Sequence, residues 1–578
     1  MSVGGKTIQV ATGFAHTCAV LQSGAVRCWG SGALGRLGTG KTVDIGDDET
    51  PAQGSSVVVT GSIDECALGI DDCDVNAHCN DEAVGFSCAC KSGYAGDGRH
   101  CADVDECAAG TATCSPDAVC TNTVGNYTCA CKGGYTGNGF TCNDVDECAA
   151  GTAGCDVHAH CTNSPGTYLC TCQSGYEGDG VTCRLRPTIV TVAAGGNHSC
   201  ALLNTGEVRC WGAANFGQLG YGNTNSIGDD EAPYVAGAVD LGGKAVEITA
   251  GENHTCARID DGTVRCWGRA SAGQLGYGNR NDIGDNEVPR VAGIVDVGGT
   301  AVHIAAGQQH TCAVLDTGSV RCWGLGETGR LGYANTRSIG DDETPASAGD
   351  VALGGKASRL ALGQYHTCAL LESGAVGCWG FGLYGQLGYA QSTTIGDDET
   401  PASAGSVNVG GSAVQIAAGA HHTCALLQTG SVRCWGYGIY GSLGYGNTDT
   451  IGNDETPASA GDVPTGGKVV NLAAGGYRTC ALMQGGAVRC WGYGMHGALG
   501  YGSTETIGDN ETPASIGDVP LGASASFVAC GATHACSVST DGVRCWGEGA
   551  LGRLGYASTS NVGDNETPAS AGTVRILQ

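Results

Sequence analysis

The chain has 578 residues, 57 acidic and 28 basic, and a formal net charge of −29, which argues against nucleic-acid binding because phosphate contacts need a basic surface. Its 102 glycines and only 15% charged residues indicate a turn-rich rather than a helical protein. Its 35 cysteines indicate disulfides and an oxidising compartment, and no apolar run reaches the about 18 residues that a membrane span needs.

Residues 1–61 carry the first copy of a phrase that occurs eight times along the chain. The cysteine of its H-T-C stretch is Cys18, and seven further copies place that cysteine every 56 residues from Cys200 to Cys536. Periods of this length are typical of propellers, solenoids or strings of modules. Because the chain starts at a repeat boundary without a signal peptide, we expect a missing N-terminal piece or a non-standard export route.

Residues 62–183 interrupt this array with three copies of a six-cysteine unit whose period is 41 residues. The middle copy reads DVDECAAGTATCSPDAVCTNTVGNYTCACKGGYTGNGFTC. A unit of about 40 residues buries too little apolar surface to fold without cross-links, so disulfides must hold it. Six cysteines permit fifteen connectivities, and the residues alone leave these open.

This unit resembles the calcium-binding epidermal-growth-factor-like module in its cysteine spacing, its C-x-C pair, its G-Y-x-G-[DN]-G turn and its ion signature, D-x-D-E-C with C-x-N-x-x-x-x-Y-x-C. The resemblance implies three modules, at residues 62–101, 102–142 and 143–183. It also implies that the first cysteine pairs with the third, the second with the fourth and the fifth with the sixth. The implied disulfides are Cys66–Cys79, Cys73–Cys88, Cys90–Cys101, Cys107–Cys120, Cys114–Cys129, Cys131–Cys142, Cys148–Cys161, Cys155–Cys170 and Cys172–Cys183.

The same resemblance implies calcium as the cofactor, held by the oxygen ligands that this hard cation prefers. In module one Ser62 replaces the first Asp, so we expect a weaker site there. One residue, Ala102 or Asn143, separates the last cysteine of one module from the first ligand Asp of the next, so calcium would make a stiff rod. The alternative is a disulfide-held spacer that binds no ion. The implied ligands are Glu65 and Asp81; Asp103, Val104, Glu106, Asn122 and Thr123; and Asp144, Val145, Glu147, Asn163 and Ser164.

Each 56-residue repeat offers four strand-like stretches, such as VQIAAG, HTCALL, SVRCWG and a weaker one after DETPA, separated by Gly, Asn and Asp. Four short strands per unit are typical of propeller blades. A three-residue turn ending at Gly430 places Leu427 opposite Ser431. Cys424 then faces Cys434 closely enough for a disulfide. Seven repeats share this spacing, the eighth is one residue shorter (Cys536 and Cys545), and Cys530 has no counterpart and should stay unpaired.

The repeat resembles that of the regulator-of-chromosome-condensation propellers in its A-A-G-x-x-H-T-C-A-L stretch, its C-W-G strand end and its G-Q-L-G-Y-G turn. The resemblance implies an all-β fold with a seven-bladed β-propeller over residues 187–578, which TIVTVAA near Thr188 would close by pairing with TVRIL at the C-terminus. Residues 1–61 would then be an orphan blade, the last of a lost upstream propeller. The alternative is an eight-bladed ring with the rod inserted between its first two blades.

Three recurring features of the repeat have structural interpretations. We expect the His before Thr-Cys to bond backbone of the neighbouring blade rather than a metal, since Arg478 replaces it once. We expect each C-W-G tryptophan to be a core residue. The I-G-D-D-E loops either cap turns and pair with the strand arginines (Arg265, Arg321, Arg433) or bind calcium weakly.

Three neighbouring repeats depart from the common pattern after C-W-G, where they become aromatic and apolar. On a propeller these loops would share one face, and a contiguous apolar patch indicates an interface. The alternative is that the aromatic before Gly is packing typical of the family. The candidate partner-binding residues are Phe381, Leu383, Tyr384, Tyr437, Ile439, Tyr440, Tyr493, Met495 and His496.

No departure from the repeat pattern assembles a nucleophile or paired acids, so we expect no enzyme. The sequence predicts a calcium-binding interaction protein, extracellular or at the cell surface, whose propeller binds an unidentified protein partner. The alternative is a secreted enzyme inhibitor or a glycan-binding propeller. Exchange activity on a small GTPase is disfavoured, because oxidised cysteines do not suit the cytosol.

Overall fold

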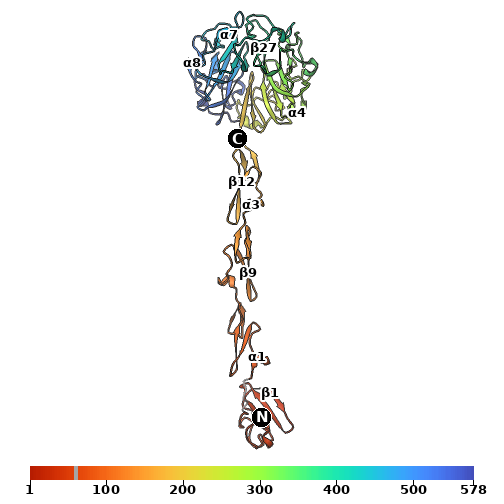
Figure 1. Ribbon diagram of the computed structural model, residues 1–578, viewed down its shortest axis with the longest axis vertical. Helices are drawn as coiled ribbons and strands as arrows, with labels where there is room; N and C mark the ends of the chain where they lie inside the picture. The colour runs from red at the N-terminus through yellow and green to blue at the C-terminus, as the bar shows by residue number, and fades with distance from the viewer. Residues whose placement is uncertain (58–62) are drawn as a thin grey trace. The chain divides into compact units, whose positions relative to one another are not determined.

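The computed structural model describes residues 1–57 and 63–578 and divides the chain into two compact units, Met1–Leu185 and Arg186–Gln578 (Figure 1). The expected boundary between residues 61 and 62, and Ser62 itself, lie outside the described residues. Among the described helices, none combines the length and the apolar character that crossing a membrane requires.

Repeat one, residues 1–57 of the first unit, forms a single antiparallel sheet of three strands in sequence order. A small core of Cys28, Leu37 and Ile45 lies against its third strand and packs on Trp29. The elements are β1 (Thr7–Thr12), β2 (His16–Leu21), β3 (Val26–Gly30) and the 3₁₀ turn η1 (Ala33–Gly35).

Each six-cysteine module folds into a one-turn helix followed by two antiparallel hairpins. Module one comprises α1 (Glu65–Leu68), β4 (Ala77–Asp81), β5 (Phe86–Cys90), β6 (Tyr94–Gly96) and β7 (Cys101–Asp103). Module two comprises α2 (Glu106–Ala109), β8 (Ala118–Thr123), β9 (Asn126–Cys131), β10 (Tyr135–Gly137) and β11 (Cys142–Asp144). Module three comprises α3 (Glu147–Ala150), β12 (Ala159–Ser164), β13 (Thr167–Cys172), β14 (Tyr176–Gly178) and β15 (Cys183–Leu185).

The short helices of the modules are defined by their caps. In α2 the side chain of Asp105 accepts a hydrogen bond from Ala108 N, and Gly110 ends the helix in the left-handed conformation. The same Asp and Gly caps flank α1 and α3. This capping holds the acidic residue of the D-E-C stretch, such as Glu106, in the first turn of its helix.

Consecutive modules share a hairpin and an aromatic contact. Asp103, the first ligand position of module two, pairs with Tyr94 in the last hairpin of module one. The Tyr94 ring also covers Gly125, where a Cβ would lie 2.7 Å from the phenol oxygen. Tyr135 covers Gly166 in the same way at the next joint. The modules therefore meet without a free linker segment.

Residues 186–578 form seven three-stranded antiparallel sheets, a propeller-type arrangement. The first strands are β16 (Ile189–Ala194), β19 (Ala245–Ala250), β22 (Ala301–Ala306), β25 (Ala357–Leu362), β28 (Ala413–Ala418), β31 (Val469–Gly475) and β34 (Ala525–Cys530). The second strands are β17 (His198–Leu203), β20 (His254–Ile259), β23 (His310–Leu315), β26 (His366–Leu371), β29 (His422–Leu427), β32 (Arg478–Met483) and β35 (His534–Ser539). The third strands are β18 (Val208–Gly212), β21 (Val264–Gly268), β24 (Val320–Gly324), β27 (Val376–Gly380), β30 (Val432–Gly436), β33 (Val488–Gly492) and β36 (Gly542–Gly547).

The expected fourth strand of each repeat is absent from the described sheets and is reduced to isolated bridges such as Val264–Val295. A one-turn helix with Pro at its start follows each acidic loop of this unit, because Pro suits a first helical turn and lacks the amide that a strand needs. These helical turns are η2 (Pro233–Ala236), α4 (Pro289–Ala292), α5 (Pro345–Ala348), α6 (Pro401–Ala404), α7 (Pro457–Ala460), α8 (Pro513–Ile516) and α9 (Pro568–Ala571). Four 3₁₀ turns follow third strands: η3 (Glu327–Gly329), η4 (Ile439–Gly441), η5 (Met495–Gly497) and η6 (Ala550–Gly552).

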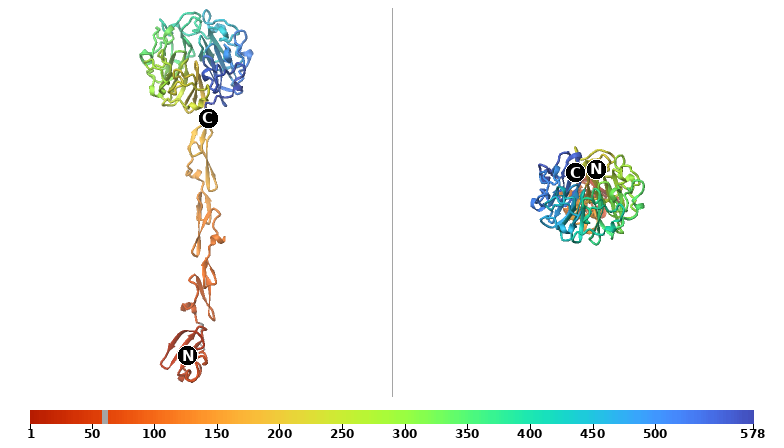
Figure 2. Two further views of the ribbon diagram at one scale, coloured as in Figure 1. Left: turned by 180° about the vertical axis from the view of Figure 1, so that it is seen from behind. Right: turned by 90° about the horizontal axis from the view of Figure 1, so that it is seen from above.

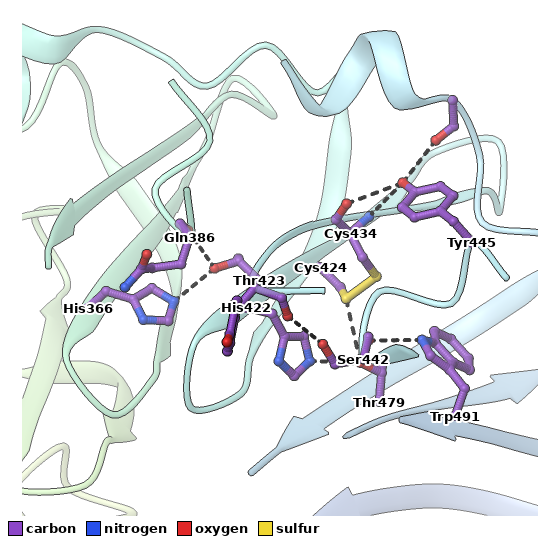
Figure 3. Close-up of a disulfide and its surroundings, with 12 residues drawn as sticks. His366, Gln386, His422, Thr423, Cys424, Cys434, Ser442, Tyr445, Thr479 and Trp491 are labelled. Carbon is purple, nitrogen blue, oxygen red and sulfur yellow. Dashed lines mark hydrogen bonds between the residues drawn. A yellow bond between two sulfur atoms is a disulfide. The ribbon is translucent and has the colours of Figure 1, made fainter. Parts of the chain in front are cut away.

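The cysteine register of the repeat is confirmed. Cys424 lies directly opposite Cys434, and Leu427 N donates to Ser431 O across the turn. The two cysteines form a disulfide, as do the equivalent pairs of the other repeats, and Cys530 is the free cysteine among the described residues. The Tyr445 hydroxyl beside this disulfide donates to Cys434 O and Gly461 O (Figure 3).

Adjacent sheets are joined by a buried His–Thr pair. The Nε2 atom of His254 lies 2.9 Å from the hydroxyl of Thr311 in the next sheet, and that hydroxyl donates to Gln274 O. The imidazole must therefore donate to the threonine, so the expectation of a backbone partner for this His is wrong. Figure 3 shows the same pairs for two further sheets.

The last sheet contacts the first through the same kind of bond. His534 Nε2 lies 2.8 Å from Ser199 Oγ, and Trp211 Nε1 donates to Arg553 O. Figure 2 shows these yellow and blue sheets side by side. The expected pairing of TIVTVAA with TVRIL is not what joins them: β16 contacts β34 and β35, whereas Val574 bridges Val543 of its own repeat.

The tryptophans of the seven sheets form the expected core. All seven are 0% exposed. Trp491 Nε1, for example, donates to Ser442 O of the preceding sheet. Trp29 of repeat one differs, because it is only half-buried.

Candidate functional site

The oxygen atoms expected to bind calcium in module two converge at the start of the module. Asp103 accepts hydrogen bonds from Gly125 N, at 2.5 Å, and from Asn122 Nδ2, at 2.8 Å. Glu106 Oε2 and Asn122 Oδ1 are buried there and have no hydrogen-bond partner among the described residues. Val104 and Thr123 immediately follow Asp103 and Asn122 in the chain. The structure thus joins Asp103 to Asn122 and packs α2, which carries Glu106, against β8, which carries Asn122.

Module three repeats this arrangement. Asp144 accepts from Gly166 N and Asn163 Nδ2, at 2.5 and 2.7 Å. Glu147 Oε2 and Asn163 Oδ1 are buried, again without a partner in the described chain. Val145 and Ser164 hold the positions of Val104 and Thr123.

These orphan oxygens fit a hard cation. A buried acceptor without a donor costs about 1–3 kcal/mol, and calcium takes carboxylate, amide and carbonyl oxygens. The bond from Gly125 N, and then that from Asn122, lowers the pKa of Asp103, which therefore stays ionised at neutral pH. The corresponding bonds from Gly166 and Asn163 lower the pKa of Asp144. The donor set of modules two and three therefore suits calcium.

Module one presents a poorer set. Glu65 Oε2 is buried without a partner in the described part of the chain. Asp81, however, is exposed at the end of β4, opposite Phe86. With one orphan oxygen instead of two, this module fits an ion less well than the other two.

The eighteen cysteines of the modules lie in disulfides that join the residues implied by the resemblance. In module two the structure joins Cys107 to Cys120, Cys114 to Cys129 and Cys131 to Cys142. The other modules contain the equivalent bonds.

The acidic loops of the repeats do not pair with the strand arginines as expected. Arg321 Nε instead donates to Asp350, and Arg433 Nε to Asp462, both at 2.8 Å and both beyond the loop in sequence. The loop carboxylates crowd one another instead, and burial, followed by the hydrogen bond that protonated Glu231 donates to the adjacent Asp230, raises the pKa of Glu231 to about 7. The three carboxylates of such a loop, for example Asp229, Asp230 and Glu231, lie close enough together to hold a metal ion, so weak calcium binding there stays a prediction.

The candidate partner-binding residues do lie together on neighbouring sheets. Tyr384 stacks on Tyr437 with ring centres 4.7 Å apart, and Tyr440 packs on Tyr493 at 4.5 Å. Phe381 lies 5.7 Å from Tyr384. Leu383, Ile439, Met495 and His496 stand in the same loops after the third strands; Leu383 is 56% and Met495 46% exposed.

Three further aromatic residues, missed from the sequence, complete this surface. Tyr365 packs 6.1 Å from Phe381, His421 lies 5.2 Å from Tyr384, and Tyr477 lies 5.6 Å from Tyr440. Each directly precedes the second strand of its sheet. Aligning the repeats at this position would have revealed them, because the equivalents there are Asn197, Asn253, Gln309 and Thr533. We call these twelve residues the aromatic surface.

Part of the aromatic surface also clamps neighbouring sheets. The slot that holds Tyr384 and Tyr437 is occupied elsewhere by Phe216 and Arg269, whose guanidinium lies 4.7 Å from the ring centre. Packing between sheets therefore accounts for the stacked pairs, as the alternative interpretation holds. It does not account for the exposed side chains of Leu383, Tyr440 and Met495.

The aromatic surface borders a central cavity of about 440 Å³ that is lined by the ends of the first strands. Tyr477, Tyr493 and Met495 belong to its wall, with Arg478 and Cys530. Burial raises the pKa of the Cys530 thiol to about 11, so this thiol is not an activated nucleophile. Of the described residues that line the cavity, Glu252 supplies the single carboxylate. The cavity thus lacks a pair of acids for catalysis.

Comparison with family models finds both kinds of unit in the chain. The RCC1-like domain matches residues 171–506, and a regulator of chromosome condensation (RCC1) repeat matches residues 8–36. An EGF domain matches residues 107–142 and 148–183, and a complement Clr-like EGF-like module matches residues 85–106.

Individual proteins resemble the repeat array. The ultraviolet-B receptor UVR8 of Arabidopsis thaliana is 30% identical over 374 residues, covering 64% of this chain and 79% of UVR8. The E3 ubiquitin-protein ligase HERC2 of Homo sapiens is 30% identical over 358 residues, covering 62% of this chain but 7% of HERC2. The crystal structure of human WBSCR16 matches with a TM-score of 0.50 and 22% identity, over 62% of this chain and 88% of WBSCR16, which shows a shared fold.

Proposed function

This chain belongs to the RCC1-like domain family, and we propose that it is a non-enzymatic extracellular scaffold. In this proposal the propeller binds a protein partner, and calcium stiffens the EGF-like modules. The observation that carries the proposal is the aromatic surface, which departs from the repeat pattern in three consecutive repeats. The disulfides support an oxidising, extracellular location.

The proposed domains are a single repeat at residues 1–61, modules at 62–101, 102–142 and 143–183, and a seven-bladed propeller at 187–578. The bond between His534 and Ser199 supports a ring of seven, because it joins the last sheet to the first as His254 and Thr311 join internal neighbours. An eighth blade would have to separate these two sheets.

The composition of the aromatic surface supports protein binding. Tyr, Phe and Met are enriched in the cores of protein interfaces, whereas charged residues are depleted there. The surface includes no Asp, Glu, Lys or Arg, although the whole chain carries a net charge of −29. Exposed Tyr440 and Met495 are suited to act as anchors.

A comparison of variants tests this function. The oxidised chain would be screened against immobilised extracellular and cell-surface proteins, together with the triple variant of Phe381, Tyr437 and Tyr493 to Ala. Partners should bind the wild type and be lost or weakened at least tenfold in the triple variant. Arg269→Ala, at the equivalent position in an unrelated part of the ring, serves as the control. Equal binding by wild type and triple variant would refute the aromatic surface as the partner site.

Calcium binding in modules two and three is the second part of the proposal. Asp103, Glu106 and Asn122, with the carbonyls of Val104 and Thr123, would hold one ion. Asp144, Glu147 and Asn163, with the carbonyls of Val145 and Ser164, would hold another. The bound ion would neutralise these carboxylates and supply the missing partners of the orphan oxygens. Glu65 and Asp81 would form a weaker site in module one.

Calorimetric titration of the chelator-treated, oxidised chain with calcium tests this part. We expect two saturable sites and a weaker third. Asp103→Ala and Asp144→Ala should each remove one site, whereas Asp72→Ala, which removes an exposed carboxylate bound to Arg99, should remove none. Wild-type chain that takes up no calcium would leave the modules as disulfide-held spacers.

A further inference from the structure

The loops that line the central cavity differ in chemistry from sheet to sheet. A glycine ends or follows each first strand, and the next residue is the first whose polarity varies among the repeats. Three consecutive sheets carry Glu or Gln there, and the other four carry Gly or Ala. These seven residues, all in the cavity wall, are Gly196, Glu252, Gln308, Gln364, Ala420, Gly476 and Ala532. The cavity therefore has one polar side that the repeat pattern does not require.

Backbone hydrogen bonds tie these loops into a collar around the cavity. Gly196 N donates to Glu252 O at 3.2 Å, and Glu252 N donates to Gln308 O at 3.3 Å. Ala420 N likewise donates to Gly476 O at 2.7 Å. Equivalent bonds to the following sheet start from Gln308 N, Gln364 N and Ala532 N. The cavity is thus preformed, and a ligand would not have to order its walls on binding.

Glu252 gives the polar side its charge. It is the only carboxylate among the described residues that line the cavity, and it is partly exposed. Arg478 is the only Lys or Arg among the same lining residues. Its guanidinium donates to three carbonyls of the next sheet rather than to Glu252, and the residue is 2% exposed. Glu252 therefore presents a negative charge that no other described residue of the cavity wall compensates.

Aromatic side chains line another part of the wall. Tyr477, Tyr493 and Met495 all belong to the cavity lining. The Tyr493 hydroxyl donates to Met495 Sδ at 3.2 Å, and Tyr440 packs against the rings of both Tyr493 and Tyr477. Because these residues also belong to the aromatic surface, the cavity opens beside the proposed partner site.

Two arginines of this chain already lie over aromatic rings in related positions. Arg269, which occupies the position of Tyr493 in its own repeat, lies 4.7 Å from the centre of the Phe216 ring. The guanidinium of Arg330 lies 4.9 Å from the centre of the Tyr365 ring. A guanidinium stacks on aromatic faces and offers a planar pair of donors to a carboxylate, whereas an ammonium is a point charge. A carboxylate beside aromatic rings is therefore suited to arginine.

We propose that the central cavity receives an arginine side chain of the protein partner. This inference rests on the proposed function and names the chemistry that the partner presents to the aromatic surface. The guanidinium would donate to Glu252, and Tyr477 and Tyr493 would contact its aliphatic stem. The cavity volume of about 440 Å³ falls within the range of about 300–1,000 Å³ that is typical of ligand sites. The net charge of −29 also favours the approach of a basic partner.

The methionines of the chain provide a direct assay. The sequence has three, of which Met495 lines the cavity, Met483 is buried at the end of β32 and Met1 is the first residue. The full, oxidised chain would be labelled with methyl-¹³C methionine and titrated with n-butylguanidinium, which mimics the arginine side chain. We expect the Met495 signal to shift saturably while the Met1 and Met483 signals stay in place. Neutral n-butylurea, of nearly the same shape, should cause no saturable shift.

Variants of the polar side test the role of Glu252. Glu252→Gln should weaken the binding of n-butylguanidinium at least fivefold. Glu372→Gln makes the same change in the exposed turn between β26 and β27 and should bind like wild type. Gln308→Glu adds a carboxylate to the polar side and should tighten binding at least threefold, a gain that misfolding cannot produce.

The outcomes separate this inference from the proposed function. Phe381 and Tyr437 lie outside the cavity lining, so their double alanine variant should lose the protein partner and still bind n-butylguanidinium. A failed partner screen with intact probe binding would count against the proposed function alone. No shift with n-butylguanidinium, an equal response to n-butylurea or methyl glucoside, or unchanged affinity in both Glu252→Gln and Gln308→Glu would overturn the arginine site.

Discussion

Arg478 and Ala535 form a compensating pair, and exchanging them gives the sharpest test of how the ring is joined. Six junctions between sheets use a buried His with a Thr or Ser of the next sheet. At the seventh, the next sheet offers Ala535, which has no hydroxyl, and the His position is Arg478. The guanidinium reaches past the alanine to Gly531 O, at 2.9 Å, and to His534 O, at 2.7 Å.

The structure sets the magnitude of each change. Arg478→His removes these two bonds and a third, from Nη1 to Ala532 O at 3.2 Å. It leaves a buried imidazole facing a methyl group. Each unsatisfied buried polar group costs about 1–3 kcal/mol, so we expect a loss of about 3 kcal/mol. Ala535→Thr alone adds a hydroxyl beside the guanidinium and should cost about 1–2 kcal/mol. Combined, the changes recreate the pair seen at the other junctions and should recover about 2 kcal/mol of the summed losses.

Denaturant unfolding of the oxidised wild type, both single variants and the double variant measures this coupling. The same cycle for a junction that already has the pair, using His422→Arg and Thr479→Ala, is the control and should show a coupling of similar size. Strictly additive losses in the double variant would refute the inference that position 478 responds to position 535. A stable Arg478→His would refute the importance of the bonds to Gly531 and His534.

Two further predictions concern buried groups in the propeller. Burial lowers the pKa of His422 to about 3, so below pH 6.5 the unfolded chain binds a proton that the folded chain excludes, and the free energy of unfolding falls as the pH drops. His422→Gln should reduce the slope of the unfolding free energy against pH by about 1.4 kcal/mol per pH unit between pH 6 and 4. An unchanged slope in urea titrations would contradict this prediction. In the wild type, Cys434 N donates a hydrogen bond to the Tyr445 hydroxyl at 3.3 Å, and Tyr445→Phe leaves this amide without a partner. We expect a loss of about 2 kcal/mol in the free energy of unfolding, measured with denaturant. An unchanged midpoint would show that water replaces the phenol.

Much of the fold follows from local sequence. The spacing of Cys424 and Cys434 around a three-residue turn predicts their register, because a hairpin turn sets which residues face each other. The six-cysteine modules could also be predicted from the sequence, because their cysteines and expected ligand residues lie within one short unit. The prediction of a fourth strand after DETPA was wrong. The residues there form a helical turn, Pro457–Ala460 in one repeat, which ends at Gly461 and leaves too few residues for a strand.

The contacts between repeats could not be read in this way. The sequence shows His254 and Thr311 as repeated residues, but only the rotation between sheets brings their side chains together, 57 positions apart. The same rotation gathers Tyr365, His421 and Tyr477 with the aromatic residues of other loops.

The sequence by itself thus determined the two kinds of repeat and the cysteine register of the hairpins, because covalent spacing and turn geometry act over a few residues. Only the tertiary structure decided which histidine meets which hydroxyl and why Arg478 accompanies Ala535. Those outcomes depend on the packing angle between whole sheets, which is summed over many side-chain contacts and is not written in any one segment.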